Sequence, residues 1–342
     1  MKKRLIWQLP FLTLLIVGTV LILRKSSQDS SKPYQENKGL IFGTTYSVKY
    51  QSPNDLGKLI AEELKHVDTS LSPFNEQSVI SAVNHNRPVK ADSLFTDVFR
   101  LAMEISRQTD GAFDITVAPL VNAWGFGFKG GSMPNAAAVD SLRAIIGYQR
   151  VKLTDEGMVV KDNPQMMLDC SAIAKGYGVD RIARLLQQNG VENFMVEIGG
   201  EVVAKGVNPR QQPWRIGITT PTDDSLAIDN DVFTVINVKD MALATSGNYR
   251  NFYYKGGKKY AHTINPATGY PVSHSLLSAT VIAADCATAD AYATAFMVMG
   301  MDRAKELLSR HPELMAYLIY NAPNGDYATW YSPQLKDKIG QQ

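Results

Sequence analysis

Two oxygen-bearing side chains, Asp290 and Thr294, stand four residues apart in the alanine-rich stretch 286–295. The stretch contains no Gly or Pro, which predicts a helix that continues into Phe296. Residues four apart lie one above the other on a helix face, so a carboxylate and a hydroxyl would point the same way from a wall of small side chains. This pair suits a hard cation, above all Mg²⁺. Taken alone, the pattern is better explained by an Asp near a helix start and a Thr bonded to its own backbone.

Six further segments are rich in Gly, Thr, Asp and Asn although their surroundings are hydrophobic. They are 43–46, 109–116, 169–178, 198–201, 245–249 and 262–269. Small residues that lead into a helix N-terminus let the backbone approach a phosphate, which the free N–H groups attract. Lys175 stands in such a turn and could hold a pyrophosphate. Neither a P-loop nor a G-x-G-x-x-G motif is present, so the common nucleotide-binding folds find no support.

The basic charge of the chain is concentrated at its N-terminus. Of the 35 basic residues, five lie among the first 25 positions, which contain no acidic residue. The rest of the chain has 30 basic and 33 acidic residues, a net charge of −3 against +2 for the whole. Because nucleic-acid binding needs an excess of positive charge, we expect no nucleic-acid partner.

Residues 5–23 are mostly apolar and uncharged, and the basic cluster Lys2-Lys3-Arg4 precedes them. A run of this length is close to the roughly 20 residues that a membrane-spanning helix needs. Residues 1–25 are therefore predicted to be a membrane anchor or, alternatively, a cleaved signal sequence. Either way the remainder is expected to be exported. We expect a protein of the cell envelope, anchored to the inner membrane with its domain on the periplasmic or extracytoplasmic side.

The polar stretch 26–38 is predicted to be a tether. From residue 39 to residue 342 there is no second linker, repeat or low-complexity block, which indicates one large domain. The two cysteines, Cys170 and Cys286, are too few for a disulfide scaffold or a zinc site, and we expect buried free thiols.

Hydrophobic periodicity predicts an α+β domain in which hairpin-type strands and helices are segregated. Predicted helices cover 56–70, 94–109, 139–146 and 178–189, besides the helix that carries Asp290. Predicted strands cover 45–50, 151–153, 158–161, 194–198, 201–205, 214–219, 233–238, 276–283, 315–320 and 326–331. We expect mixed or antiparallel sheets with packed helices rather than a doubly wound parallel sheet.

In order and spacing, these segments resemble the ApbE family of flavin transferases over about residues 40–335. The matching motifs are G-T-x-Y, D-G-A-F-D-I-T-x-x-P-L-V-x-x-W-G-F, A-K-G-Y-x-V-D, I-G-G-E, T-S-G-x-Y, H-x-I-N-P-x-T-G and A-D-A-x-A-T. The resemblance implies a T-fold-related domain and a Mg²⁺-dependent enzyme that splits FAD, releases AMP and places FMN on a Thr hydroxyl of an exported acceptor protein. The chain contains no flavinylation motif of such acceptors, so it resembles the enzyme and not its target.

The resemblance also implies roles for particular residues. It implies metal ligands at the backbone carbonyl of Ala172 and the side chains of Asp290 and Thr294. It implies contacts to FAD at Phe42, Phe74, Ala112, Phe113, Asp114, Asp169, Lys175 and Ile264.

The chain departs from the family pattern at three of its motif positions. Phe42 stands where relatives often have Met, and Phe74 where they often have Tyr. Both changes keep a large apolar surface for the flavin or the adenine, so we expect binding to be retained. Asn265 replaces a frequent Asp, which removes one possible charge from that motif.

The nucleophile of the implied reaction, a Thr hydroxyl of the partner, is weak at neutral pH and needs a base. His262 lies in a polar motif and has the right kind of side chain, because imidazole titrates near neutral pH. Asp114 or a metal-bound group could take the proton instead. Two other functions stay open: an FAD pyrophosphatase that gives FMN and AMP, and a non-catalytic flavin-binding protein of the envelope.

Overall fold

The structure, a computed structural model, describes residues 14, 15, 17, 19, 32–128, 133–222, 231–249 and 252–340. The predicted anchor, residues 1–25, lies outside the described residues except at four positions. Within the part of the chain that is described, no helix is both long and apolar enough to cross a membrane. The first strand begins at Tyr34, so residues 34–38 belong to the folded domain and not to the predicted tether. Their side chains are polar, but each residue pairs with the next strand, which satisfies the backbone.

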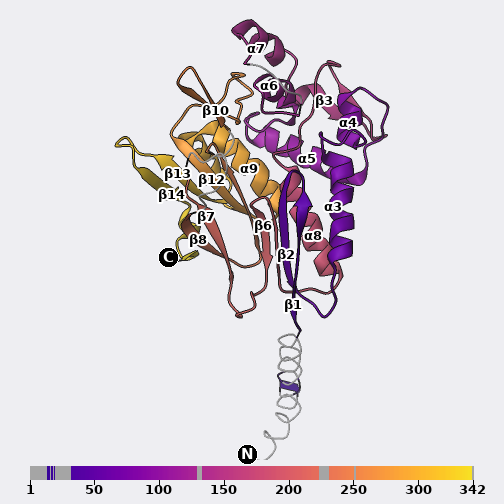
Figure 1. The fold of residues 1–342 in the computed structure, drawn as a ribbon, viewed down its shortest axis with the longest axis vertical. Helices are drawn as coiled ribbons and strands as arrows, with labels where there is room; N and C mark the ends of the chain where they lie inside the picture. The colour runs from indigo at the N-terminus through magenta and orange to yellow at the C-terminus, as the bar shows by residue number, and fades with distance from the viewer. Residues whose placement is uncertain are drawn as a thin grey trace, which may run out of the picture.

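An eight-stranded antiparallel sheet forms the centre of the domain (Figure 1). Its strands follow the order β1-β2-β5-β6-β9-β12-β13-β14. They are β1 (Tyr34–Ile41), β2 (Thr44–Gln51), β5 (Phe194–Ile198), β6 (Glu201–Lys205), β9 (Met241–Gly247), β12 (Leu276–Ala283), β13 (Met315–Asn321) and β14 (Tyr327–Tyr331). Each neighbouring pair is antiparallel, which confirms the predicted α+β class.

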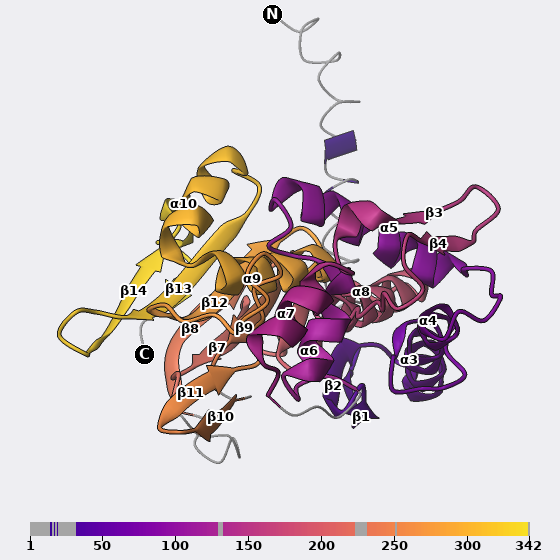
Figure 2. The same ribbon diagram turned by 90° about the horizontal axis from the view of Figure 1, so that it is seen from above.

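Helices cover one face of this sheet (Figures 1 and 2). Helix α9 packs across β9 and β12 and against α8, while α8 lies over β5 and β6. Outside these two, α3 packs on α8 and α5 packs on α9. The described helices are α3 (Gly57–Leu71), α4 (Val79–Asn84), α5 (Ser93–Gln108), α6 (Ala118–Ala123), α7 (Ala136–Arg143), α8 (Ala174–Gln188), α9 (Cys286–Met299) and α10 (Met301–Arg310).

A second, three-stranded sheet packs on the other face, in the order β15-β8-β7. Its strands are β7 (Trp214–Thr219), β8 (Val232–Val238) and β15 (Ile339–Gly340). Leu243 of β9 and Ile282 of β12 point into the core between the two sheets, and their neighbours Ala244 and Val281 point into the helical core. Successive strand residues face opposite sides, so these central strands are apolar on both. Two hairpins complete the fold, β3 (Val151–Leu153) with β4 (Val159–Lys161), and β10 (Phe252–Lys255) with β11 (Lys258–Ala261).

Several described elements differ from the sequence prediction. The prediction lacked the helices α4, α6 and α10 and the strands β1, β9, β10, β11 and β15, and it began α7 and α8 too late. Strand β9 was not predicted, because its small residues have weak strand propensity; pairing with β6 on one side and β12 on the other stabilises it. Helix α8 begins at Ala174, four residues earlier than predicted, although Gly176 and Gly178 are poor helix formers. Helix α7 begins three residues earlier than predicted, because the side chain of Asn135 caps it.

Candidate active site

A cavity of about 580 Å³ lies between the turns β1–β2 and β5–β6, the start of α8, one face of α9 and the loop after β11. This volume falls within the range of small-molecule sites. Every residue predicted to hold metal, contact FAD or take a proton lines this cavity. They are Phe42, Phe74, Ala112, Phe113, Asp114, Asp169, Ala172, Lys175, His262, Ile264, Asp290 and Thr294.

Helix α9 is fixed at its start by two carboxylates. Asp285 is its N-cap and accepts a hydrogen bond from the backbone N–H of Thr288 at 2.9 Å. Asp180 of α8 accepts from the N–H groups of Cys286 and Ala287 at 2.8 and 2.9 Å. Burial raises the pKa of Asp180 to about 7, although these two hydrogen bonds favour its charged form. The last residue of the A-K-G-Y-x-V-D motif thus positions the helix that carries Asp290.

Gly176 lets the backbones of α8 and α9 come into direct contact. A Cβ atom at this position would lie 2.3 Å from the carbonyl oxygen of Cys286. The N–H of Gly176 donates to Oδ2 of Asp290 at 3.1 Å. The glycine therefore gives the space for the close approach and one of the contacts that orient the Asp290 carboxylate.

Asp290 is 2% exposed, and among the described residues its carboxylate pairs with the ammonium of Lys175. Nζ of Lys175 lies 3.9 Å from its Oδ1. Burial raises the pKa of Asp290, and the ammonium of Lys175 and the N–H of Gly176 partly offset this rise. Lys175 lies in the first turn of α8, not in a turn before the helix as predicted.

Lys175 makes its shorter ion pair with Glu201, the first residue of β6. Nζ lies 2.5 Å from Oε1 of Glu201. Burial alone would lower the pKa of Lys175, but the charges of Asp290 and Glu201 outweigh it and hold that pKa above its usual range. Burial raises the pKa of Glu201, and Lys175 opposes this effect. The site therefore contains two buried carboxylates that share one ammonium group.

The T-S-G-x-Y motif supports Thr294 from β9. Oγ of Ser246 lies 3.1 Å from Oγ1 of Thr294, and the hydroxyl of Thr245 pairs with Thr280 of β12 at 2.8 Å. Gly247 leaves space for the ring of Tyr249, which would lie 2.3 Å from a Cβ atom. The contact from Ser246 orients the hydroxyl that the sequence predicted as a metal ligand.

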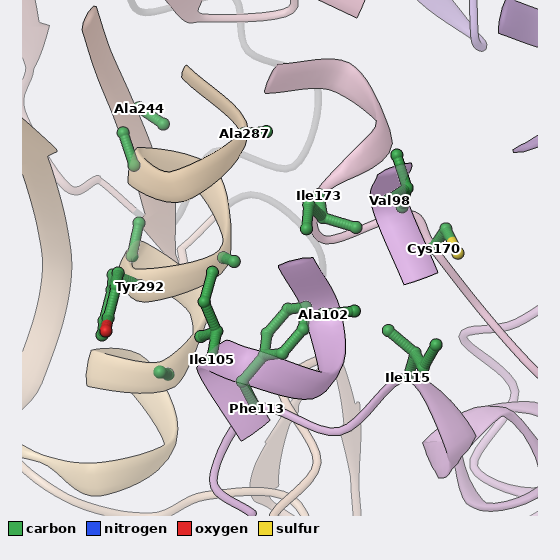
Figure 3. Close-up of a cluster of buried hydrophobic side chains, with 14 of the residues drawn as sticks. Val98, Ala102, Ile105, Phe113, Ile115, Cys170, Ile173, Ala244, Ala287 and Tyr292 are labelled. Atoms are coloured by element: carbon green, nitrogen blue, oxygen red, sulfur yellow. The ribbon is translucent and has the colours of Figure 1, made fainter. Parts of the chain in front are cut away.

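The D-G-A-F-D motif joins the cavity to the helical core. Figure 3 shows Phe113 beside Ala102 and Ile105, with Ile115 in the same cluster, and all four are buried. Oδ1 of Asp114 accepts from the N–H and hydroxyl of Thr116, and Oδ2 accepts from a backbone N–H at 2.9 Å. Burial raises the pKa of Asp114. Because both oxygens already accept hydrogen bonds, Asp114 is a weaker candidate for the base than the sequence suggested.

The H-x-I-N-P-x-T-G motif forms another part of the cavity wall. The ring of His262 lies 6.4 Å from that of Phe126, edge to face, and Thr263 donates to Asn248 at 2.7 Å. Asn265 does not line the cavity; its Oδ1 accepts from Ala267 N–H at 2.9 Å. The Asp-to-Asn difference therefore affects a turn, where an amide oxygen accepts the same hydrogen bond, and not the charge of the cavity.

Aromatic side chains form the mouth of the cavity. Phe42 stands at the tip of the β1–β2 turn with φ of +52°, a conformation unusual for a bulky residue. A Cβ atom at Gly178 would lie 2.9 Å from its ring, so the ring rests against α8. Phe74 is 71% exposed and its ring lies 6.1 Å from that of Phe128. Phe74 leaves a large apolar surface open to solvent, which a planar ligand would cover.

The segment before α8 contributes Asp169 and Ala172 to the cavity. Oδ1 of Asp169 accepts from the N–H of Ser171 at 2.8 Å, and burial raises the pKa of this carboxyl. Cys170 and Cys286 are buried free thiols, as predicted, and burial raises the pKa of both.

The donors at Asp290 fit Mg²⁺ better than a transition metal. In the described part of the chain, no three His, Cys, Asp or Glu side chains come together to hold a metal. Mg²⁺ does not need such a cluster, because it binds through one or two carboxylates together with water and substrate phosphates. Oε2 of Glu201 is also buried on the cavity wall and has no hydrogen-bond partner in the part of the chain that the structure describes, so it can still accept a hydrogen bond.

Sequence reasoning missed three residues of the site. The sequence marks Glu201 and Ser246 only as members of the I-G-G-E and T-S-G-x-Y motifs, and it assigns no role to Asp180. The signal for Glu201 was an acidic residue directly before the apolar run Val202-Val203-Ala204 of a strand. No local signal identifies Ser246 or Asp180, because their partners lie 48 and 106 residues away.

Comparison with known proteins agrees with this picture. The model of the ApbE family matches residues 42–319. The FAD:protein FMN transferase of Salmonella typhimurium (strain LT2) is 36% identical over 320 residues, covering 90% of each chain. That of Vibrio cholerae serotype O1 is 40% identical over 277 residues, covering 78% of this chain and 81% of the relative.

Two solved structures have the same fold. The flavin transferase ApbE from Vibrio cholerae superposes with a TM-score of 0.80 at 34% identity, covering 90% of this chain and 99% of the other. The apo form of Pseudomonas stutzeri flavinyl transferase ApbE has a TM-score of 0.80 at 29% identity, covering 91% and 98%.

Fold and site together define an α+β enzyme with a buried acidic cavity beneath an aromatic mouth. The chain belongs to the ApbE family. The family and the fold class predicted from the sequence are confirmed.

Proposed function

We propose that this protein transfers FMN from FAD to a Thr hydroxyl of an exported acceptor protein in a Mg²⁺-dependent reaction that releases AMP. The predicted enzyme class, a flavin transferase, agrees with the relatives named above. One observation carries the proposal. Asp290, Thr294, Lys175 and His262 come from three distant segments and line one cavity.

The cavity has a polar and an apolar part, as FAD requires. The aromatic mouth at Phe42 and Phe74 offers ring surface for the flavin or the adenine. Lys175 carries the positive charge that attracts a pyrophosphate, and it stands in the first turn of α8, where the helix dipole adds to it. We infer that the pyrophosphate lies between the start of α8 and the face of α9.

Asp290, Thr294 and the carbonyl of Ala172 are the groups that would hold Mg²⁺, which would neutralise charge on the phosphate oxygens. Asp290 is oriented by Gly176 and Thr294 by Ser246, so both ligands are held before a cation arrives. Pre-positioned ligands lose less conformational freedom on binding.

His262 is the proposed base, since it lines the same cavity as Asp290 and Lys175. It would take the proton of the acceptor Thr as its oxygen attacks the FMN-side phosphorus and AMP leaves. The proposed location is the cell envelope, with residues 1–25 as an inner-membrane anchor that places the domain on the side of its exported acceptor.

The test compares Asp290→Ala with Asp302→Ala, which removes a carboxylate from the exposed first turn of α10, outside the cavity. Each protein is incubated with FAD, Mg²⁺ and a candidate acceptor; covalent flavin fluorescence on the acceptor reports transfer, and free FMN with AMP reports hydrolysis. Asp290→Ala should abolish turnover and Asp302→Ala should keep it. Thr294→Ala should be milder, because water can replace a neutral hydroxyl. Near-normal activity of Asp290→Ala under chelator-controlled Mg²⁺ would refute the metal site.

A further inference from the structure

The ammonium of Lys175 stands between two buried carboxylates at unequal distances. Its Nζ lies 2.5 Å from Oε1 of Glu201 and 3.9 Å from Oδ1 of Asp290. The three residues come from α8, β6 and α9, so their spacing is set by the packing of separate elements. An ammonium that paired closely with Asp290 would occupy the carboxylate that the proposed Mg²⁺ site needs.

The backbone fixes Glu201 in its place. Ile198 pairs with Glu201 across a two-residue hairpin turn in which Gly199 and Gly200 have φ of +65° and +106°. Glu201 is 2% exposed, and among the described residues its Oε2 has no hydrogen-bond partner. A buried carboxylate with one unused oxygen is costly, which argues for a role beyond stabilising the hairpin.

We propose that Glu201 is a positioning residue that holds the ammonium of Lys175 and so keeps Asp290 open to a divalent cation. The inference rests on the proposed function, because it assumes a cation at Asp290. With Lys175 paired to Glu201, the ammonium stays in the cavity for the pyrophosphate. The carboxylate of Asp290 is then available to the metal.

The first variant is Glu201→Gln, which keeps the shape of the side chain and removes its charge. Among the residues that the structure describes, Asp290 is then the remaining carboxylate paired with Lys175 within 4 Å, and a cation must displace the ammonium from it. Loss of a group that orients a metal ligand typically weakens metal affinity by about 10–100-fold. We expect Mn²⁺ binding to full-length protein without FAD, followed by electron paramagnetic resonance, to weaken by this amount.

A double-mutant cycle with Lys175→Met separates the proposed role from a direct one. If Glu201 acts through Lys175, Lys175→Met should restore Mn²⁺ affinity in the Glu201→Gln protein. The Glu201→Gln change should then have little effect in the Lys175→Met background. Equal weakening in both backgrounds would show that Glu201 acts on the cation directly, and would overturn the inference.

Three controls make the result interpretable. Glu197→Gln makes the same change on the same hairpin at a residue outside the cavity, and should leave Mn²⁺ affinity unchanged. Glu201→Asp keeps the charge, and its Mn²⁺ affinity should lie between that of the Glu201→Gln protein and that of the wild type. Asp290→Ala tests the metal site itself: if it binds Mn²⁺ as well as the wild type, the proposed function is at fault. A Glu201→Gln protein with a lower melting temperature and unchanged Mn²⁺ affinity would show a merely structural role and overturn the inference.

Discussion

The contact between α8 and α9 at Gly176 allows a prediction that can be worked from the structure. A Gly176→Ala substitution would place a Cβ atom 2.3 Å from the carbonyl oxygen of Cys286, 2.7 Å from its carbonyl carbon and 2.9 Å from Cα of Ala287. All three are backbone atoms, so no side chain can rotate away. Ordinary van der Waals contact begins at 3.4 Å, and the two helices must therefore separate by about 1 Å.

This separation affects both stability and chemistry. Overpacking a core costs about 1–3 kcal/mol, which lowers the melting temperature by roughly 2–12 °C at about 2–4 °C per kcal/mol. The same movement lengthens the hydrogen bond from Gly176 to Asp290 and displaces Asp290 from Lys175. A misplacement of about 1 Å can cost about 10²-fold in rate, so we expect a loss of kcat of this size at a temperature where the variant is folded.

The assay measures thermal melting and the rate of flavin transfer on the same preparations. Gly340→Ala is the matched control: it adds the same methyl group in β15, where the nearest atom, Nδ2 of Asn237, lies 3.4 Å away. It should leave both quantities near their wild-type values. A Gly176→Ala protein with wild-type melting temperature and rate would show that the close approach of α8 and α9 does not position Asp290.

Two further predictions concern the base and the start of the domain. His262→Ala should slow transfer by about 10²–10⁴ with little change in FAD affinity, and should remove a rise of rate with pH across the usual imidazole range of about 6–7; weakened binding with an unaltered pH profile would contradict this role. A chain beginning at Lys32 should be soluble and active, because the carbonyls of Lys32 and Pro33 keep their hydrogen bonds to β2 and to the residue after it. A chain beginning at Gly39 loses five of the eight residues of β1 and should melt at a lower temperature. A folded but inactive chain from Lys32 would show that the N-terminal segment contributes to the site.

Local patterns in the sequence predicted most of the elements that build the site. Alternating and continuous apolar runs predicted strands such as β5, β6 and β12, because the two faces of a strand differ every second residue. The alanine-rich stretch predicted α9, since small residues without Gly or Pro favour a helix. The order of the motifs along the chain, and not any one motif, predicted the family. The family in turn implied that the predicted site residues lie in one cavity.

Tertiary structure decided what depends on distant partners. Strand β9 and the first turn of α8 have weak local propensity and exist because neighbouring elements pair with or pack on them. The same holds for the roles of individual groups. Asp180 caps a helix 106 residues away, and Asp114 is committed to backbone and hydroxyl donors.

The sequence by itself determined the residue types of the site, the α+β class and the family, since these follow from composition, periodicity and motif order. Which carboxylate pairs with Lys175 was decided only when β6, α8 and α9 packed together. The energy of an ion pair depends on distance and burial, and neither is a property of the local sequence.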